Sequence, residues 1–157
     1  MELERMNDDF IRLDVEKING YLCAIESLNI VDCPRVDYSF TYLQKTASLL
    51  KSVESHIAGA YPDTLLEYWH INLDKINENQ FYDSINTWFF QFCKAEIMRN
   101  QLTSLQVGFA DLLSQLVYPL DVHRVNMIPP VWYATHWETF LMDSKNGCFL
   151  LEFSFDT

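Results

Sequence analysis

The sequence predicts a mainly α fold, a single-domain helical bundle with a C-terminal antiparallel β-hairpin packed on it. Apolar residues recur at helical spacing through most of the chain, and glycine and proline are scarce, at 4 and 5 of 157 residues. The last quarter changes to aromatic and β-branched residues on both sides of a turn. We expect one domain over 1–157, helical over 1–118, with a connector over 119–130 and the hairpin over 131–156.

The first helix is predicted over residues 8–28. One apolar stripe advances there in steps of four and three residues, which brings its members onto one helical face, and Asp8 or Asp9 can cap the start. The stripe consists of Ile11, Val15, Ile18, Leu22 and Ile25.

A second helix is expected to begin at Asp37 and to end at Gly59 and Pro62. A short third helix follows from Asp63 and carries Leu65, Leu66 and Trp69. The buried stripe of the second helix would be Phe40, Leu43, Ala47, Leu50 and Ile57.

From Asn79 the helical pattern returns and continues until Pro119, as one long helix or as two helices stacked end to end. Asp111 is the only charged residue between positions 100 and 117, which favours a helix covered on most sides. The stripe runs through Phe81, Ile85, Trp88 and Phe92, then through Leu102, Leu105, Phe109, Leu112 and Leu116.

The hairpin is predicted from its alternating pattern, with Asn146-Gly147 in the turn. Its second strand places four apolar residues on one face, which we expect the helices to cover. In the first strand, alternation puts Trp132, His136 and Glu138 on one side and Tyr133 and Trp137 on the other, so one side should expose aromatic residues. The four residues of the covered face are Phe149, Leu151, Phe153 and Phe155.

The composition excludes several classes of function. With 22 acidic and 11 basic residues, the net charge of −11 opposes direct binding of nucleic acid. The acidic N-terminus is unlike a secretory signal, and no apolar run is long enough to span a membrane. The cysteines at 23, 33, 93 and 148 form no CxxC pair, which favours free thiols and a cytoplasmic protein.

Two short polar motifs carry residue types that can form a chemical site. His136-Trp137-Glu138 resembles the start of a zinc deaminase signature, but no PCxxC pair follows it. Asp121 and His123 lie in the expected connector, yet no nucleophile motif or phosphate loop accompanies them. We therefore expect no catalytic residue, no metal and no cofactor; the alternative is a small hydrolase that uses Asp121, His123, His136 and Glu138.

The acidic excess is typical of a solvated helix face. It also fits a docking surface for a basic protein, because charge steers encounter between complementary surfaces. Acids are frequent near the N-terminus, and the connector and hairpin add polar and aromatic candidates. The residues predicted to bind the partner are Asp8, Asp9, Asp14, Glu16, Asp121, Trp132, His136 and Glu138.

In size, acidity and lack of catalytic apparatus, the chain resembles the immunity proteins of bacterial toxin systems, including contact-dependent growth inhibition. The resemblance implies a small cytoplasmic binding protein that neutralises a cognate toxin domain, such as a basic nuclease that cleaves tRNA or other RNA. Because the resemblance rests on no shared motif, it assigns no function to any individual residue of this chain. The alternative is an acidic helical adaptor or regulatory subunit for a non-toxin partner, and a homodimer is compatible with either.

Overall fold

The computed structural model describes residues 2–29, 35–90 and 99–156, with side chains described from residue 7 in the first range and from residue 103 in the third. Its helices are α1 (Glu2–Asn29), α2 (Leu49–Ala60), α3 (Glu78–Phe90) and α4 (Arg99–Leu116), with one 3-10 turn, η1 (Leu66–Trp69). Its strands are β1 (Arg35–Leu43), β2 (Asn72–Ile76), β3 (Asp121–Asn126), β4 (His136–Ser144) and β5 (Gly147–Asp156).

The five strands form one antiparallel sheet in the order β1-β5-β4-β3-β2. The predicted mainly α bundle with a hairpin is therefore wrong, and the fold is α+β. The hairpin of β4 and β5 does form, but its turn residues are Lys145 and Asn146 and not the predicted Asn146-Gly147. Its first strand begins at His136 and not at position 131, and the hairpin lies inside a larger sheet. Two strands alone bury too little apolar surface, and pairing with β1 and β3 extends the hairpin to a stable sheet.

Three strands form where the sequence predicted none. The expected helix from Asp37 is instead β1 followed by α2, which starts only after Ser48, whose Oγ accepts a hydrogen bond from Lys51 N at 3.1 Å. The expected helical region 1–118 also contains β2, and the expected connector 119–130 contains β3. Nine residues of β1 pair with β5, and this long pairing decides the conformation of a segment that also fits a helical pattern.

Other predicted elements are confirmed. The first helix is present as α1. The third predicted helix, by contrast, is wrong, because only the single 3-10 turn η1 forms there. Helix α3 starts at a reciprocal cap, in which Asn77 Oδ1 accepts from Gln80 N and Gln80 Oε1 accepts from Asn77 N. Helix α4 ends at Leu116, before Pro119 as predicted. The predicted stripe residue Phe92, together with Cys33 and Cys93, lies outside the described residues.

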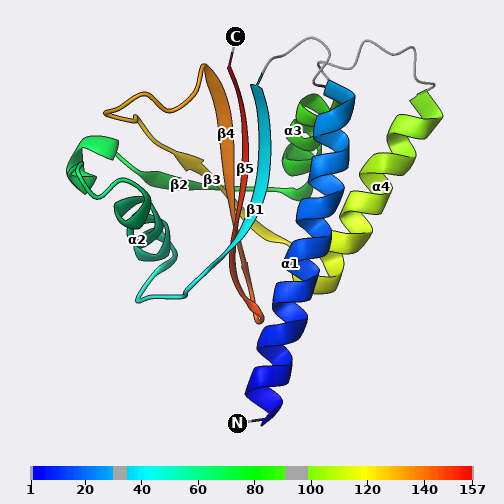
Figure 1. Ribbon diagram of the computed structural model, residues 1–157, viewed down its shortest axis with the longest axis horizontal. Helices are drawn as coiled ribbons and strands as arrows, with labels where there is room; N and C mark the ends of the chain where they lie inside the picture. Colours follow the sequence, from blue (N-terminus) through cyan, green and yellow to red (C-terminus); the bar gives the residue numbers. More distant parts are fainter. Residues whose placement is uncertain (1, 30–34, 91–98, 157) are drawn as a thin grey trace.

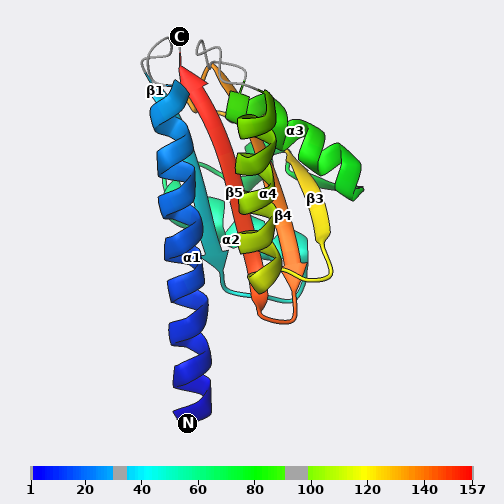
Figure 2. The same cartoon turned by 90° about the vertical axis from the view of Figure 1, so that its right-hand side faces the viewer.

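Helices cover both faces of the sheet (Figures 1 and 2). Helices α1, α3 and α4 pack on one face, which we call the three-helix face, whereas α2 and η1 pack on the other, the α2 face. The predicted alternation in β5 is confirmed, because Phe149, Leu151 and Phe153 are fully buried on the three-helix face and Phe155 packs beside them. Within the described residues, none of the helices combines the length and apolarity needed to cross a bilayer.

Candidate partner-binding surface

The predicted partner-binding residues lie in several separate places. Asp8, Asp9 and Glu16 are exposed on α1, and Asp14 is half-buried beside Lys17, with 3.9 Å between the Asp14 carboxylate and the Lys17 ammonium. Helix α1 extends past the end of the sheet at its N-terminus (Figure 2), so this acidic stretch is far from the β3–β4 connection. The acids of α1 and the residues of the hairpin therefore form different surfaces.

Glu138 has an internal role on the three-helix face. Its Oε1 accepts a hydrogen bond from Trp88 Nε1 at 3.0 Å, and its Oε2 lies 3.2 Å from Arg124 Nε. The Arg124 guanidinium also lies over the Phe140 ring, 5.9 Å from its centroid. This carboxylate joins β4 to α3 and β3, and much of its hydrogen-bonding capacity is used inside the molecule.

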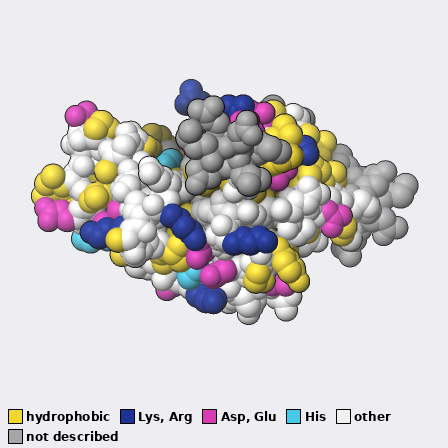
Figure 3. Space-filling view, turned by 90° about the horizontal axis from the view of Figure 1, so that it is seen from below, with side chains coloured by type: hydrophobic (Ala, Val, Ile, Leu, Met, Phe, Trp, Pro, Cys, Tyr) yellow, Lys and Arg dark blue, Asp and Glu magenta, His cyan; other side chains and the backbone are white. Residues whose placement is uncertain are grey.

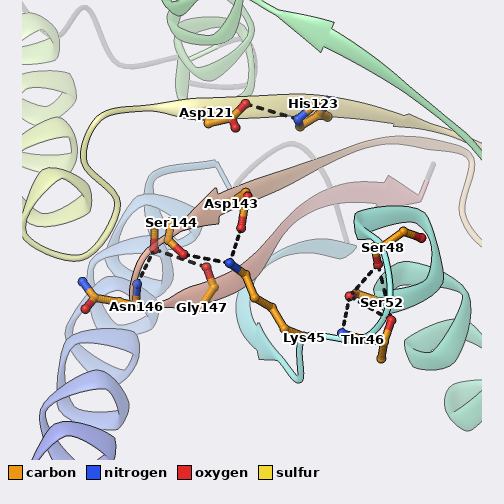
Figure 4. Close-up of polar contacts among 10 residues, drawn as sticks. All are labelled: Lys45, Thr46, Ser48, Ser52, Asp121, His123, Asp143, Ser144, Asn146 and Gly147. Atoms are coloured by element: carbon orange, nitrogen blue, oxygen red, sulfur yellow. Dashed lines mark hydrogen bonds and ion pairs between the residues drawn. The ribbon is translucent and has the colours of Figure 1, made fainter.

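Asp121 belongs to a charge cluster on the α2 face, where two strands place carboxylates directly opposite each other. Asp121 in β3 is the register partner of Asp143 in β4. Like charges at opposed positions repel, and basic side chains lie beside both carboxylates. His123 Nε2 lies 3.2 Å and Lys75 Nζ lies 3.7 Å from Asp121, and Lys45 Nζ lies 2.8 Å from Asp143 (Figure 4). The hydrogen bond to Asp143 is the main cause that raises the pKa of Lys45.

The structure does not assemble the alternative hydrolase site. His136 stacks on Phe155 of the three-helix face, 4.6 Å between ring centroids, and Glu138 lies on that face as well. Asp121 and His123 alternate with Val122, which is in the three-helix core, so their side chains lie on the opposite face of the sheet. Among the described residues, no group of three metal-ligating side chains converges either.

Trp132 lies on a different surface, at one end of the sheet. This surface is formed by η1 and by the connection between β3 and β4. These two segments are adjacent, because Ile128 N donates to Trp69 O at 2.7 Å, and they project together on the left of Figure 1. Trp132 is 75% exposed. Four further large apolar side chains are exposed here, namely Leu65, Tyr68, Ile128 and Val131.

The same end of the molecule is acidic. The segments that build it, 61–71 around η1 and 127–135 in the connection, contain no lysine or arginine, and the first of them carries two exposed acids, Asp63 and Glu67. Figure 3, which views the molecule from below, shows hydrophobic and acidic side chains at its left-hand edge, with basic side chains beside them. We call this surface the acidic aromatic end, and define it by Asp63, Leu65, Glu67, Tyr68, Ile128, Val131 and Trp132.

Sequence reasoning found Trp132 but missed most of this surface. Leu65 and Leu66 were both predicted as helix-stripe residues, whereas η1 buries Trp69 and leaves Leu65 exposed. The pair Pro129-Pro130, which interrupts the connection before the exposed tryptophan, is the one sequence feature that pointed to an irregular, projecting segment. Its closeness to residues near position 68 depends on the pairing of β2 with β3.

No family model matches the chain, and no curated protein matches it. Among solved structures, the chain is similar to the crystal structure of citrus MAF1, with a TM-score of 0.57, 13% sequence identity, and coverage of 89% of this chain and 96% of that chain. At this identity the similarity concerns the fold, and it agrees with the α+β architecture described above.

Proposed function

We propose that this protein is a binding protein that docks a basic protein domain through the acidic aromatic end. The observation that carries the proposal is the combination of five exposed large apolar side chains with exposed acids, in segments that contain no lysine or arginine. Exposed tryptophan and tyrosine are the side chains that most often dominate protein interfaces. A basic partner is favoured because its charge complements both this surface and the net charge of −11.

The more specific proposal is that the partner is a toxin domain, in particular a basic nuclease, and that the complex forms in the cytoplasm and blocks the toxin. A nuclease presents lysine and arginine to the phosphates of its substrate. An acidic protein can therefore cover such a groove. Asp8, Asp9 and Glu16 on α1 would then add to the net negative charge that attracts a basic partner during encounter, without joining the contact, and this attraction should weaken at high ionic strength.

The experiment is a co-purification of the tagged protein with the products of neighbouring genes, followed by a toxicity rescue in cells. Three variants test the surface: Trp132→Ala, Tyr68→Ala and Glu67→Lys. The matched control is Tyr118→Ala, because Tyr118 is 74% exposed, close to the 75% of Trp132, but follows α4 on the other side of the sheet. We expect Trp132→Ala to weaken the complex by tenfold or more, at a cost of roughly 2 kcal/mol, and the control to leave it unchanged.

Two results would count against this function. If Trp132→Ala and Tyr118→Ala weaken the complex equally, the acidic aromatic end is not the docking surface. If a stoichiometric partner is found that is not a toxin and no neighbouring product is toxic, the protein is an adaptor or regulatory subunit, and the toxin proposal is wrong while the docking surface stands.

A further inference from the structure

A small cavity lies between α2 and the α2 face of the sheet. Its volume is about 110 Å³, and α2 contributes His56 and Ile57 to its wall. Since one water molecule takes about 30 Å³ of liquid volume, the cavity has room for a group of about four heavy atoms. Its other lining residues are Val53, Ala60, Tyr61, Val125, Met127, Tyr133, Thr139, Leu150 and Glu152.

The cavity contains one carboxylate, that of Glu152 in β5. Its Oε2 accepts a hydrogen bond from Tyr133 Oη at 3.0 Å, and its Oε1 lies 3.7 Å from His56 Nε2. Among the residues that the structure describes, His56 is the only basic side chain within ion-pair distance of this carboxylate. Burial, followed by the adjacent Glu152 charge, raises the pKa of Tyr133 and that of Tyr61, so both phenols stay neutral.

Thr139 in β4 adds a buried oxygen to the same wall. The residue is 3% exposed, and its Oγ1 lies near the Tyr133 phenol but makes no hydrogen bond of ordinary geometry within the described part of the chain. A buried polar atom without a partner costs about 1–3 kcal/mol, so such atoms usually mark a water or a ligand. The cavity therefore presents a carboxylate and an unused oxygen beside apolar walls.

We propose that this cavity binds a primary alkylammonium group. An ammonium has three N–H donors and no acceptor, and Glu152, Thr139 and the phenol oxygens supply acceptors for them. The alkyl stem would lie against Val53, Ile57 and Leu150, and the rings of Tyr61 and Tyr133 add cation–π attraction. This proposal does not depend on the partner proposed above.

The direct test compares two probes of nearly equal shape in an NMR titration of the wild-type protein, n-butylammonium and neutral n-butanol. We expect butylammonium to bind at least about tenfold more tightly, because a charge-assisted hydrogen bond contributes about 1.5–3 kcal/mol. The shifted resonances should belong to residues around the cavity. Equal affinity of the two probes, or shifts spread over the acidic surface as a whole, would overturn the proposal.

Variants then locate the binding. Glu152→Gln keeps an acceptor for Tyr133 but removes the charge, and should weaken butylammonium by about tenfold. Thr139→Val should weaken it about threefold while leaving butanol unaffected. The control is Asp83→Asn, an equal loss of charge at an exposed position of α3, on the other face of the sheet, and it should change nothing. Equal losses in Glu152→Gln and Asp83→Asn would mean that the amine responds to net charge alone.

Free amines and lysine side chains both carry this group, and a third probe separates them. A lysine with both backbone ends capped presents the same butylammonium stem attached to a chain. If the capped lysine binds as tightly as butylammonium, the cavity can accept the side chain of a lysine in a bound protein. If only the free amine binds, the ligand is a small molecule.

Discussion

Asn19 of α1 forms two hydrogen bonds to the backbone of Phe40, the residue at the middle of the edge strand β1. Its Nδ2 donates to Phe40 O at 2.7 Å, and its Oδ1 accepts from Phe40 N at 2.8 Å. Two helical turns later, Glu26 accepts a hydrogen bond from Tyr38 N. The helix thus satisfies the free edge of the sheet with side chains, where a further strand would otherwise be able to pair.

Asn19→Ala should therefore destabilise the protein more than a surface substitution does. It leaves two half-buried backbone groups without partners, and we expect the free energy of unfolding to fall by about 2 kcal/mol. Urea unfolding followed by circular dichroism measures it. Asn7→Ala, at an exposed position of the same helix, is the control. A loss no larger than that of the control would show that water replaces Asn19 at this edge.

Two glycines inside helices should respond in opposite ways to alanine. At Gly20 nothing lies within 4 Å of an added Cβ, so Gly20→Ala should stabilise by about 1 kcal/mol through helix propensity. At Gly108 the Cβ would lie 2.6 Å from Tyr21 Oη, which donates to Leu105 O across the contact of α1 with α4. Gly108→Ala should therefore destabilise by about 1–2 kcal/mol.

The thermal unfolding midpoints of Gly20→Ala and Gly108→Ala, each compared with the wild type, test both expectations. A second comparison isolates the cause, because in a Tyr21→Phe background the added methyl group no longer meets a hydroxyl, and Gly108→Ala should cost less there. If the cost is the same in both backgrounds, the phenol oxygen is not what excludes a side chain at position 108.

Glu138 should be important for stability, and Glu138→Ala separates this role from partner binding. Without its carboxylate the indole N–H of Trp88, which is 6% exposed, loses its acceptor, and Arg124 loses its ion pair. We expect a loss of about 1–3 kcal/mol in the free energy of unfolding and a change in tryptophan fluorescence. Glu138→Gln keeps an acceptor and should lose less. Glu16→Ala, at an exposed position, is the control.

Stability should fall as the pH rises from about 9 to about 12. Burial raises the pKa of Cys148 from 9.0 to about 11 and that of Tyr82 from 10.0 to about 12, and it also raises that of Tyr133. The folded protein keeps these protons at a pH where the unfolded chain releases them. Their contribution is thus complete below the unfolded pKa values and is lost as the pH approaches the folded ones.

Urea unfolding midpoints across this pH range measure the effect. Tyr82→Phe should flatten the decline, because it removes one of the titrating groups, whereas Tyr68→Phe, at an exposed tyrosine, should not. A decline of the same slope in wild type and Tyr82→Phe would assign the alkaline loss of stability to other groups.

The fold could be predicted only in part, and β1 shows why. Phe40 and Leu43 fit a helical stripe that continues to Ile57, but Val36, Tyr38, Phe40 and Tyr42 also alternate as a strand does. Local periodicity cannot choose between the two patterns. The choice depends on β5, whose residues 148–156 pair with β1 although more than a hundred positions separate them in the sequence.

The candidate surface divides in the same way. Trp132 could be singled out from its aromatic setting, but it was expected on one side of the first hairpin strand together with His136 and Glu138. It lies instead in the connection before β4, where it is 75% exposed. The sequence could not show that Glu138, unlike Trp132, faces the interior. Alternation indicates on which side of a strand a residue lies, but not whether a helix covers that side. Here α3 brings Trp88 to Glu138, and only the packed helix shows that this acid has an internal partner.

By itself the sequence determined the acidity, the first helix, the hairpin and the buried face of β5, because each depends on composition or on contacts between near neighbours in the chain. Tertiary structure alone decided the five-stranded sheet, the cover of helices on both faces, and the meeting of η1 with the β3–β4 connection. These depend on pairing between distant segments, where hydrogen bonds and buried area across the sheet outweigh local preference.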